Sequence, residues 1–245
     1  MEASAEDTQT RILRAFTVLS SLRANWAGAL VLNVGLDPIG SAISLAANVA
    51  GAVSLAVEPD SALVRNALRT GSCDFVVNTL DEALRAIKNE IRKHRPLSVG
   101  LEGDPTSVLT EIIDRGVAPE LFASPMAYPE AAAHFQALGA LLLSFDEEAD
   151  SAAGPATLIG TADRILEALL ATRAWGMRAF SFSNSAEVRA FDARALSLLP
   201  AESGGASEDR LRRRWLLSAA HILPRERHRV LWLTEPEQRK LATDN

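Results

Sequence analysis

The sequence has one cysteine, Cys73, and no hydrophobic run long enough to cross a membrane. A single cysteine excludes an intrachain disulfide, which suits a reducing compartment. The first residues, MEASAEDTQTR, are polar and acidic, and they lack the basic-then-apolar pattern of a secretion signal. A bilayer span needs about 20 consecutive apolar residues, and no run approaches that length. We therefore expect a cytoplasmic protein that does not insert into membranes.

Motifs for metal binding and for common enzyme chemistry are also missing. No two histidines lie four residues apart, the helical spacing that places two metal ligands on one face. The sequence has no G-x-S-x-G, no phosphate-loop lysine motif and no Cys-x-x-Cys pair. We interpret Cys73 as a small buried hydrophobic residue at the start of a strand. We expect no metal site; the histidines are His94, His134, His221 and His228.

Short apolar runs alternate with helical segments along most of the 245 residues. The runs are apolar throughout rather than at every second residue, which is typical of a parallel sheet with helices on both faces. We therefore predict an α/β fold with a doubly wound, mostly parallel, Rossmann-like sheet. The six predicted strands span residues 29–34, 52–57, 74–78, 97–101, 120–124 and 140–145.

We predict one large domain in four parts. Residues 1–27 form a polar leader and a helix, and 28–145 form the Rossmann-like sheet. The small and polar residues of 146–160 form a linker or surface loop. Residues 161–245 complete the same domain, with predicted helices at 161–172, 185–199 and 207–221 and predicted strands at 177–183 and 228–234.

Charge is distributed unevenly, although the net charge is −6. Residues 206–245 contain nine Lys or Arg and six Asp or Glu, so this part carries +3 and the rest −9. The basic stretch from Arg210 to Arg229 could bind anions or nucleic acid, or it could be a solvated helix face. Acidic residues interrupt the run and few aromatic residues lie within it, so we favour the solvated face and expect no nucleic-acid partner.

The stretch NVGLDPIGS follows the first predicted strand and partly matches the dinucleotide-binding pattern G-x-G-x-x-G. Gly35 and Gly40 occupy the outer glycine positions, and Asp37 occupies the middle one. The middle glycine normally lets the backbone approach a pyrophosphate. The candidate cofactor-binding residues are Gly35, Gly40, Ser41 and Glu58, which together make a degenerate dinucleotide site.

Proline occurs in four of the corners that follow predicted strands: GLDPIG, EPDS, EGDPTS and ASPMAYPE. Asp or Ser before Pro is typical of a helix start, because the side chain accepts hydrogen bonds from first-turn N–H groups. We predict that the chain caps these helices itself. Asp37 and Asp104 would then oppose a bound phosphate by charge.

Glu58 ends the second predicted strand, 23 residues after Gly35. An acidic residue at that place commonly binds an adenosine ribose. A carboxylate is also favourable near the first turn of the following helix. The sequence leaves both interpretations open.

Several segments together resemble the urocanase family, the urocanate hydratases of histidine degradation. They include AGALVLNVGLDPIGSAISLAANVAGAVSLAVEPD, PLSVGLEGDPTSVLTEIIDRGVAPEL and WLLSAAHILPRERHRVLWLTEPEQRKLA. The resemblance covers most of 8–145 and part of 175–242. It implies the family's Rossmann-like NAD domain, without the segments that build the family's separate core. In that family the nicotinamide of NAD⁺ acts as an electrophile toward the imidazole of urocanate, so that water is added without net redox change.

The resemblance transfers few functional residues. The family corner GLGGMGG falls on residues 35–41, where three of its glycines are replaced, and the family arginine after the retained Glu58 falls on Leu63. The family signature TDQTSAHD falls on residues 123–130, which keep neither its glutamine nor its histidine. No cysteine lies near Gly176, where the family's active-site cysteine is expected. The resemblance alone implies NAD; the residues predict neither a cofactor nor catalytic groups.

We therefore expect a pseudoenzyme of the urocanase family that acts as a ligand-binding, regulatory or scaffold protein. The alternative is an active NAD-dependent urocanate hydratase, a lyase. Expected partners are a second copy of the chain, a urocanase-like protein or a small molecule.

Overall fold

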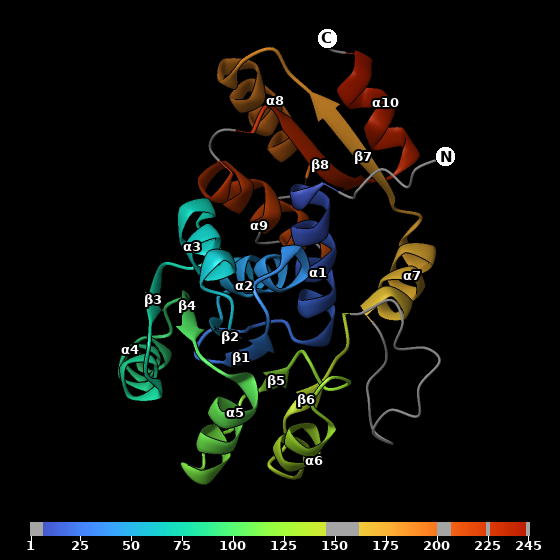
Figure 1. Cartoon of the computed structure of the whole chain (residues 1–245). Coiled ribbons are helices and arrows are strands. Elements are labelled where there is room, and N and C mark those ends of the chain that lie inside the picture. The colour runs from blue at the N-terminus through green and yellow to red at the C-terminus, as the bar shows by residue number, and fades with distance from the viewer. Residues whose placement is uncertain (1–6, 146–161, 200–206, 224–225, 244–245) are drawn as a thin grey trace, which may run out of the picture. The chain divides into compact units, whose positions relative to one another are not determined.

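The computed structural model describes residues 7–145, 162–199, 207–223 and 226–243. Backbone contacts divide the chain into two compact units (Figure 1). We call Asn25–Ile165 the sheet unit, and Met1–Ala24 together with Leu166–Asn245 the terminal unit. The predicted linker at 146–160 lies outside the described residues.

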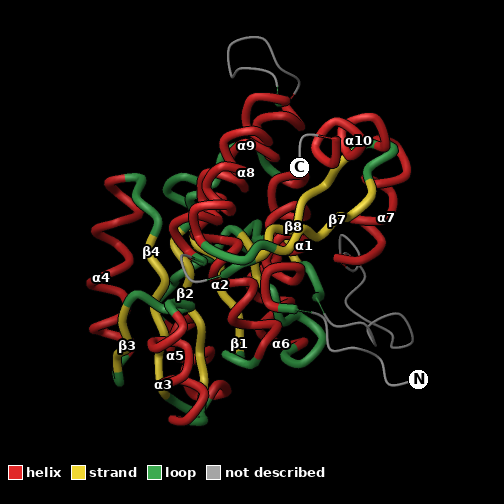
Figure 2. The backbone as a smooth tube through the Cα atoms, turned by 90° about the horizontal axis from the view of Figure 1, so that it is seen from above, coloured by secondary structure: helices red, strands yellow, loops and turns green. Residues whose placement is uncertain are grey.

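The sheet unit contains a six-stranded parallel sheet in the order β3-β4-β2-β1-β5-β6. Helices flank the strands (Figure 2), so the predicted α/β, Rossmann-like fold is confirmed. The strands β5 and β6 are shorter than the apolar runs that predicted them. The strands are β1 (Leu30–Val34), β2 (Val53–Glu58), β3 (Phe75–Val77), β4 (Leu97–Glu102), β5 (Leu121–Phe122) and β6 (Leu141–Leu142).

One face of the sheet is covered by α4 (Leu80–Lys93), α5 (Pro105–Asp114) and α6 (Pro129–Ala137). Their buried side chains pack against the central strands, and Phe135 meets Phe122 edge-on with 5.2 Å between ring centroids. Burial of this apolar face is the main force that holds the helices to the sheet.

The opposite face is covered by α2 (Pro38–Ala50) and α3 (Ser61–Thr70). Three polar side chains between α2 and the strands are paired with one another: the hydroxyls of Ser54 and Ser98 lie 3.0 Å apart, and the Asn48 amide donates to Ser98 Oγ at 3.0 Å. Pairing removes much of the cost of burying these groups.

The terminal unit has its own two-stranded antiparallel sheet, β7 paired with β8. The described residues after 161 therefore add no strand to the parallel sheet, although the sequence placed both parts in one domain. The predicted domain boundaries themselves stay a prediction. The elements are α1 (Thr8–Leu22), α7 (Ala162–Arg173), β7 (Gly176–Ser181), α8 (Ser185–Leu198), α9 (Ser207–Ile222), β8 (His228–Leu233) and α10 (Glu235–Thr243), with α7 beginning at the end of the sheet unit.

The first helix is joined to the last strand by side-chain hydrogen bonds. Gln9 accepts from the Val230 N–H at 2.7 Å and donates to the His228 carbonyl at 3.2 Å. The indole N–H of Trp232 donates to the Thr17 hydroxyl at 2.7 Å. These bonds fix α1 against β8 inside the terminal unit.

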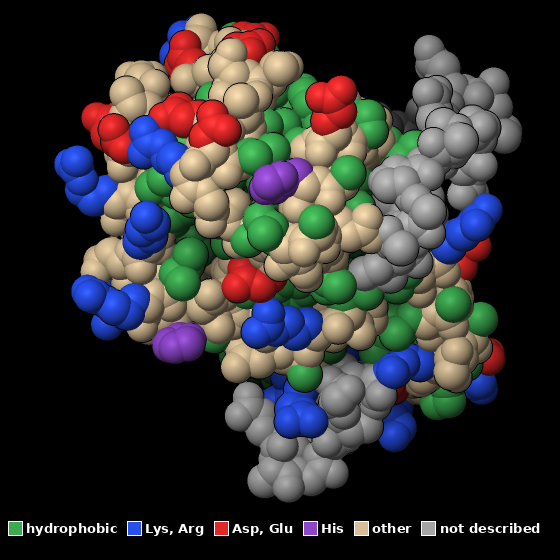
Figure 3. All heavy atoms as spheres, turned by 90° about the horizontal axis from the view of Figure 1, so that it is seen from below, with side chains coloured by type: hydrophobic (Ala, Val, Ile, Leu, Met, Phe, Trp, Pro, Cys, Tyr) green, Lys and Arg blue, Asp and Glu red, His purple; other side chains and the backbone are tan. Residues whose placement is uncertain are grey.

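Surface charge is mixed on the face of the molecule in Figure 3, where basic, acidic and hydrophobic side chains are interspersed. In the described part of the chain, no helix is both long and apolar enough to span a bilayer.

A buried ion pair links α8 to β8. Arg229 Nε donates to Asp192 Oδ1 at 2.9 Å and Nη2 donates to Oδ2 at 3.1 Å, and the two side chains are 3% and 11% exposed. Such a pair is costly to break from one side, because the remaining charge stays buried without a partner.

We expect Asp192→Asn to lower the free energy of unfolding by about 3 kcal/mol. Urea unfolding followed by tryptophan fluorescence measures this, since Trp175, Trp215 and Trp232 lie in the terminal unit. The control, Glu235→Gln, removes the exposed pair with Arg239 and should cost below about 1 kcal/mol. Equal losses in the two variants would show that burial of the Asp192 pair is unimportant.

Candidate functional site

The candidate site lies at the carboxyl ends of the parallel strands. β1 pairs with β2 on one side and with β5 on the other, while the chain continues from β1 into β2 and reaches β5 only after β4. The strand order therefore reverses beside β1, and ligands of open α/β sheets bind at such a point. The corner between β1 and α2 is at this edge.

The β1–α2 corner is anchored to the sheet by its backbone and by one side chain. The Gly35 N–H donates to the Val57 carbonyl at 2.8 Å, and the Asn33 amide donates to the Gly35 carbonyl at 2.9 Å. Leu36 is 1% exposed and packs against a cluster that includes Ala56 and Cys73. Leu36 thus anchors the corner in this apolar cluster.

Both glycines of the partial motif are required by the fold. Gly35 has φ +98°, a conformation that side-chain-bearing residues rarely adopt. A Cβ on Gly40 would lie 2.1 Å from the Gly35 carbonyl oxygen, because α2 starts directly against the corner. Gly40 is therefore explained by packing alone.

Asp37 caps α2, as the sequence predicted. Its Oδ1 accepts from the Ile39 N–H at 3.0 Å and from the Gly40 N–H at 2.7 Å. The Ser41 hydroxyl donates to the Leu36 carbonyl at 3.0 Å and the Ser41 N–H donates to the Asp37 carbonyl at 2.9 Å. The first turn of α2 is thus engaged within the chain.

The other proline corners differ in how their helices begin. Asp60 accepts from the Ala62 N–H at 2.7 Å and Asp104 accepts from the Ser107 N–H at 2.8 Å, so both caps are confirmed. The prediction was wrong for the fourth corner. There α6 begins only at Pro129 and has no side-chain cap.

Ser124, in that fourth corner, bridges two strands instead of capping a helix. Its hydroxyl accepts from the Val34 N–H at 3.0 Å and so extends the contact between β1 and β5. Sequence reasoning missed this role because the contact joins residues that lie 90 positions apart.

Glu58 lies close to the start of the following helix, as one of its two interpretations expected, and it also makes a contact that the sequence did not predict. The side chain is 4% exposed. Its Oε1 accepts from the Asp60 N–H at 2.8 Å, close to the start of α3, and its Oε2 accepts from the Leu36 N–H at 2.7 Å. The carboxylate therefore ties the β1–α2 corner to the β2–α3 corner. Both carboxylate oxygens thus already accept a hydrogen bond from the chain, without a ribose hydroxyl.

The edge is electrostatically negative. Burial raises the pKa of Tyr128, and the carboxylates of Asp104 and Glu58 raise it further. Hydrogen bonds from the Ser107 backbone and hydroxyl lower the pKa of Asp104, which therefore stays ionised at neutral pH. A phosphate would meet like charge here.

A bound dinucleotide places its pyrophosphate against free N–H groups at a helix start. Here the N–H of Leu36 donates to Glu58, and those of Ile39 and Gly40 donate to Asp37. In this arrangement the residues of the corner do not fit a pyrophosphate held in the Rossmann manner.

Cys73 is buried, as predicted, just before β3. Burial, with a smaller effect of the Asp74 charge, raises the pKa of its thiol to about 12. The thiol is therefore protonated at neutral pH and is a poor nucleophile.

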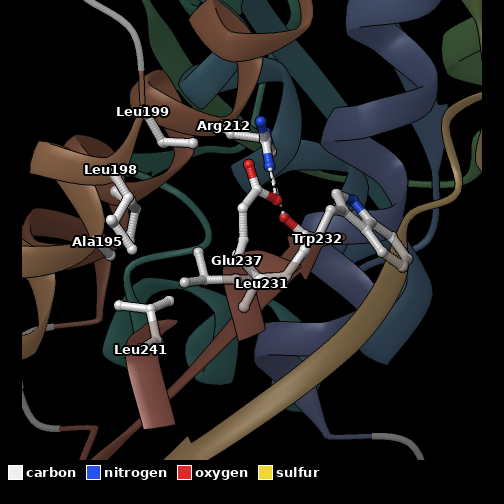
Figure 4. Close-up of a pocket in the computed structure, with 10 residues that line it drawn as sticks. Ala195, Leu198, Leu199, Arg212, Leu231, Trp232, Glu237 and Leu241 are labelled. Atoms are coloured by element: carbon white, nitrogen blue, oxygen red, sulfur yellow. Dashed lines mark hydrogen bonds and ion pairs between the residues drawn. The ribbon is translucent and has the colours of Figure 1, made fainter. Parts of the chain in front are cut away.

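A small cavity in the terminal unit is too narrow for a ligand (Figure 4). It measures about 10 Å³, roughly the space of one water molecule, and it is bordered by leucines of α8, β8 and α10. Beside it Arg212 Nη1 donates to Glu237 Oε2 at 2.8 Å. The ion pair helps to hold α9 to α10.

These observations define the class of protein first: the sheet unit is a Rossmann-like α/β domain whose phosphate corner is bonded within itself. The family follows from comparison, since the family model of the urocanase Rossmann-like domain matches residues 8–197. The chain belongs to this family. The match covers α1, the whole sheet unit and the following residues as far as 197, and it ends before α9.

We expect Gly40→Ala to lower the free energy of unfolding by about 2–3 kcal/mol, because the added methyl overlaps backbone that cannot move freely. The matched control is Gly103→Ala, whose Cβ would lie 3.2 Å from a Val108 methyl group. Circular dichroism during urea unfolding compares the two. If Gly40→Ala is tolerated as well as the control, the close approach of α2 to the corner is wrong.

Acid should weaken the Arg212–Glu237 pair. Burial raises the pKa of Glu237, but hydrogen bonds from Arg212 and Thr234 lower it more, and the net pKa lies below the ordinary 4.5. The pair's stabilisation is therefore complete above pH 4.5 and is lost as the pH falls through the lowered pKa. We expect Glu237→Gln to be less stable than wild type at neutral pH, with the gap narrowing in that acid range. A gap independent of pH in urea unfolding would contradict this.

Proposed function

We propose that the chain is a non-catalytic member of the urocanase Rossmann-like domain family, with a regulatory or scaffold role. The observation that carries the proposal is the double hydrogen bond of Glu58, which occupies the Leu36 N–H and closes the corner. Glu58, the acidic residue that would bind the ribose in a dinucleotide site, here holds two corners of the fold together.

Dinucleotide binding at this corner would require several exchanges at once. The bond from Leu36 to Glu58 and the bonds from Ile39 and Gly40 to Asp37 would have to break. Hydrogen bonds to a charged group each contribute about 1.5–3 kcal/mol. The cofactor would also have to overcome repulsion by the carboxylates of the edge.

The groups expected of a hydratase are missing at this edge. The segment that matches the family signature provides Ser124, whose hydroxyl is used between β1 and β5, and Tyr128, whose raised pKa makes it a weak acid. Cys73 is buried under α3 and is protonated. These features favour a protein that kept the fold of the family and lost its chemistry.

The edge of the sheet at β3 is suited to pair with a strand of another chain. β3 is an outer strand, and Phe75, Val76 and Val77 are half-buried. An outer strand presents unpaired backbone groups on one side, which can pair with a strand of another protein. This feature supports a scaffold role.

We expect NAD to cause no protection of the peptides that cover Gly35–Ser41 in hydrogen-exchange mass spectrometry, and urocanate to keep its ultraviolet absorbance when the chain and NAD are added. In Asp37→Gly the N–H groups of Ile39 and Gly40 lose their cap, so any NAD-dependent protection of the corner should appear first in this variant. Protection of Gly35–Ser41 by NAD in the wild type, or turnover of urocanate, would favour the NAD-dependent hydratase instead.

A further inference from the structure

The arginines of α9 lie in different environments, which the run of charge in the sequence does not distinguish. Arg212 is buried in its pair with Glu237, and Arg213 donates to the Leu196 carbonyl at 2.9 Å. Arg210 and Arg214 lie one helical turn apart and therefore share another face of α9. This face borders a cavity of ligand size.

That cavity measures about 550 Å³, within the range of about 300–1,000 Å³ that small-molecule sites occupy. It is formed by α1, the end of α7 with the residues before β7, and α9, all within the terminal unit. We call it the α9 pocket. Its lining residues are Phe16, Ser20, Ser21, Ala24, Leu169, Arg173, Trp175, Arg210, Leu211, Arg214, Leu217 and Ser218.

The lining of the α9 pocket is positively charged and supplies hydrogen-bond donors. It includes three guanidinium groups and the hydroxyls of Ser20, Ser21 and Ser218, of which Ser21 Oγ already donates to the Val18 carbonyl at 2.7 Å. None of the lining residues whose side chains the structure describes is acidic. The Arg173 guanidinium lies 5.3 Å from the centroid of the Trp175 ring, a cation–π contact that orients it.

We propose that the α9 pocket binds a small phosphorylated organic molecule, of the size of a sugar phosphate or a mononucleotide. Guanidinium groups hold phosphate oxygens through paired N–H donors, and the hydroxyls of Ser20 and Ser218 add further donors. Leu169, Leu211 and Leu217 provide apolar surface for the organic part. The three arginines attract an anion locally, although the whole chain carries a net charge of −6.

This site is separate from the β1–α2 corner and does not depend on the proposed function. Arg210 and Arg214 lie beyond the residues that match the family, which end at 197. The pocket therefore combines residues of the matched range, such as Phe16, Leu169 and Arg173, with arginines that lie beyond it.

Isothermal titration calorimetry with AMP, inorganic phosphate and adenosine tests the proposal. We expect AMP to bind most tightly, phosphate to bind more weakly and adenosine not to bind. The affinity for AMP should fall with rising salt, since charge pairs carry it. No heat from AMP or phosphate, or binding of adenosine as tight as that of AMP, would overturn the proposal.

Substitutions of the pocket arginines test whether AMP binds in the α9 pocket. Arg210→Gln with Arg214→Gln should weaken AMP binding by about a hundredfold, since each charge-assisted contact contributes about tenfold. Arg214→Lys keeps the charge but loses the paired donors, so it should be intermediate. The matched control is Arg239→Gln, an exposed arginine of α10 that should leave affinity unchanged. Thermal melting verifies that all variants fold.

Equal AMP binding by the double variant and by Arg239→Gln would overturn the assignment to the α9 pocket. NAD also carries phosphates, so it is titrated into the double variant as well. NAD binding that disappears there belongs to the α9 pocket. NAD binding that remains there contradicts the proposed function of the sheet unit and leaves the pocket to be judged by AMP alone.

Discussion

The carboxylate of Glu58 is the contact on which the geometry of the candidate site depends. It accepts hydrogen bonds from the N–H groups of Leu36 and Asp60, which lie in two different corners. The Glu58 side chain is almost completely buried. With Leu36 held by its backbone and by its buried side chain, α2 starts close against the corner and Gly40 must be glycine. Asp37 then caps the helix. A Rossmann-like edge is thereby closed by groups of the chain itself.

The features that could be predicted from the sequence are local ones. Apolar runs of strand length predicted the parallel strands. Asp followed by Pro predicted the caps at Asp37 and Asp104, because a cap acts within one turn of its own helix. The second partner of Glu58 could not be predicted, since Leu36 is brought to it only when β1 and β2 align. The role of Ser124 depends in the same way on the pairing of β1 with β5.

The terminal unit illustrates the same limit. The elements from α7 to β8 were predicted from their sequence patterns, whereas α10 was not predicted. The pairing of β7 with β8 was also missed, because this pairing and the bonds from α1 to β8 join distant parts of the chain. The arginines of α9 were visible as a run of charge. Their separate roles follow from a helical period of 3.6 residues, which directs Arg212 inward and Arg210 with Arg214 to another side.

The central claim is that the Leu36 N–H is held by Glu58 and is unavailable to a cofactor. Residue-resolved amide exchange by NMR measures this bond directly. The account predicts that the Leu36 amide exchanges slowly in the protein alone, faster in Glu58→Gln, and at an unchanged rate when NAD is added to the wild type. Fast exchange of Leu36 in the protein alone, with protection appearing only after NAD is added, would contradict it.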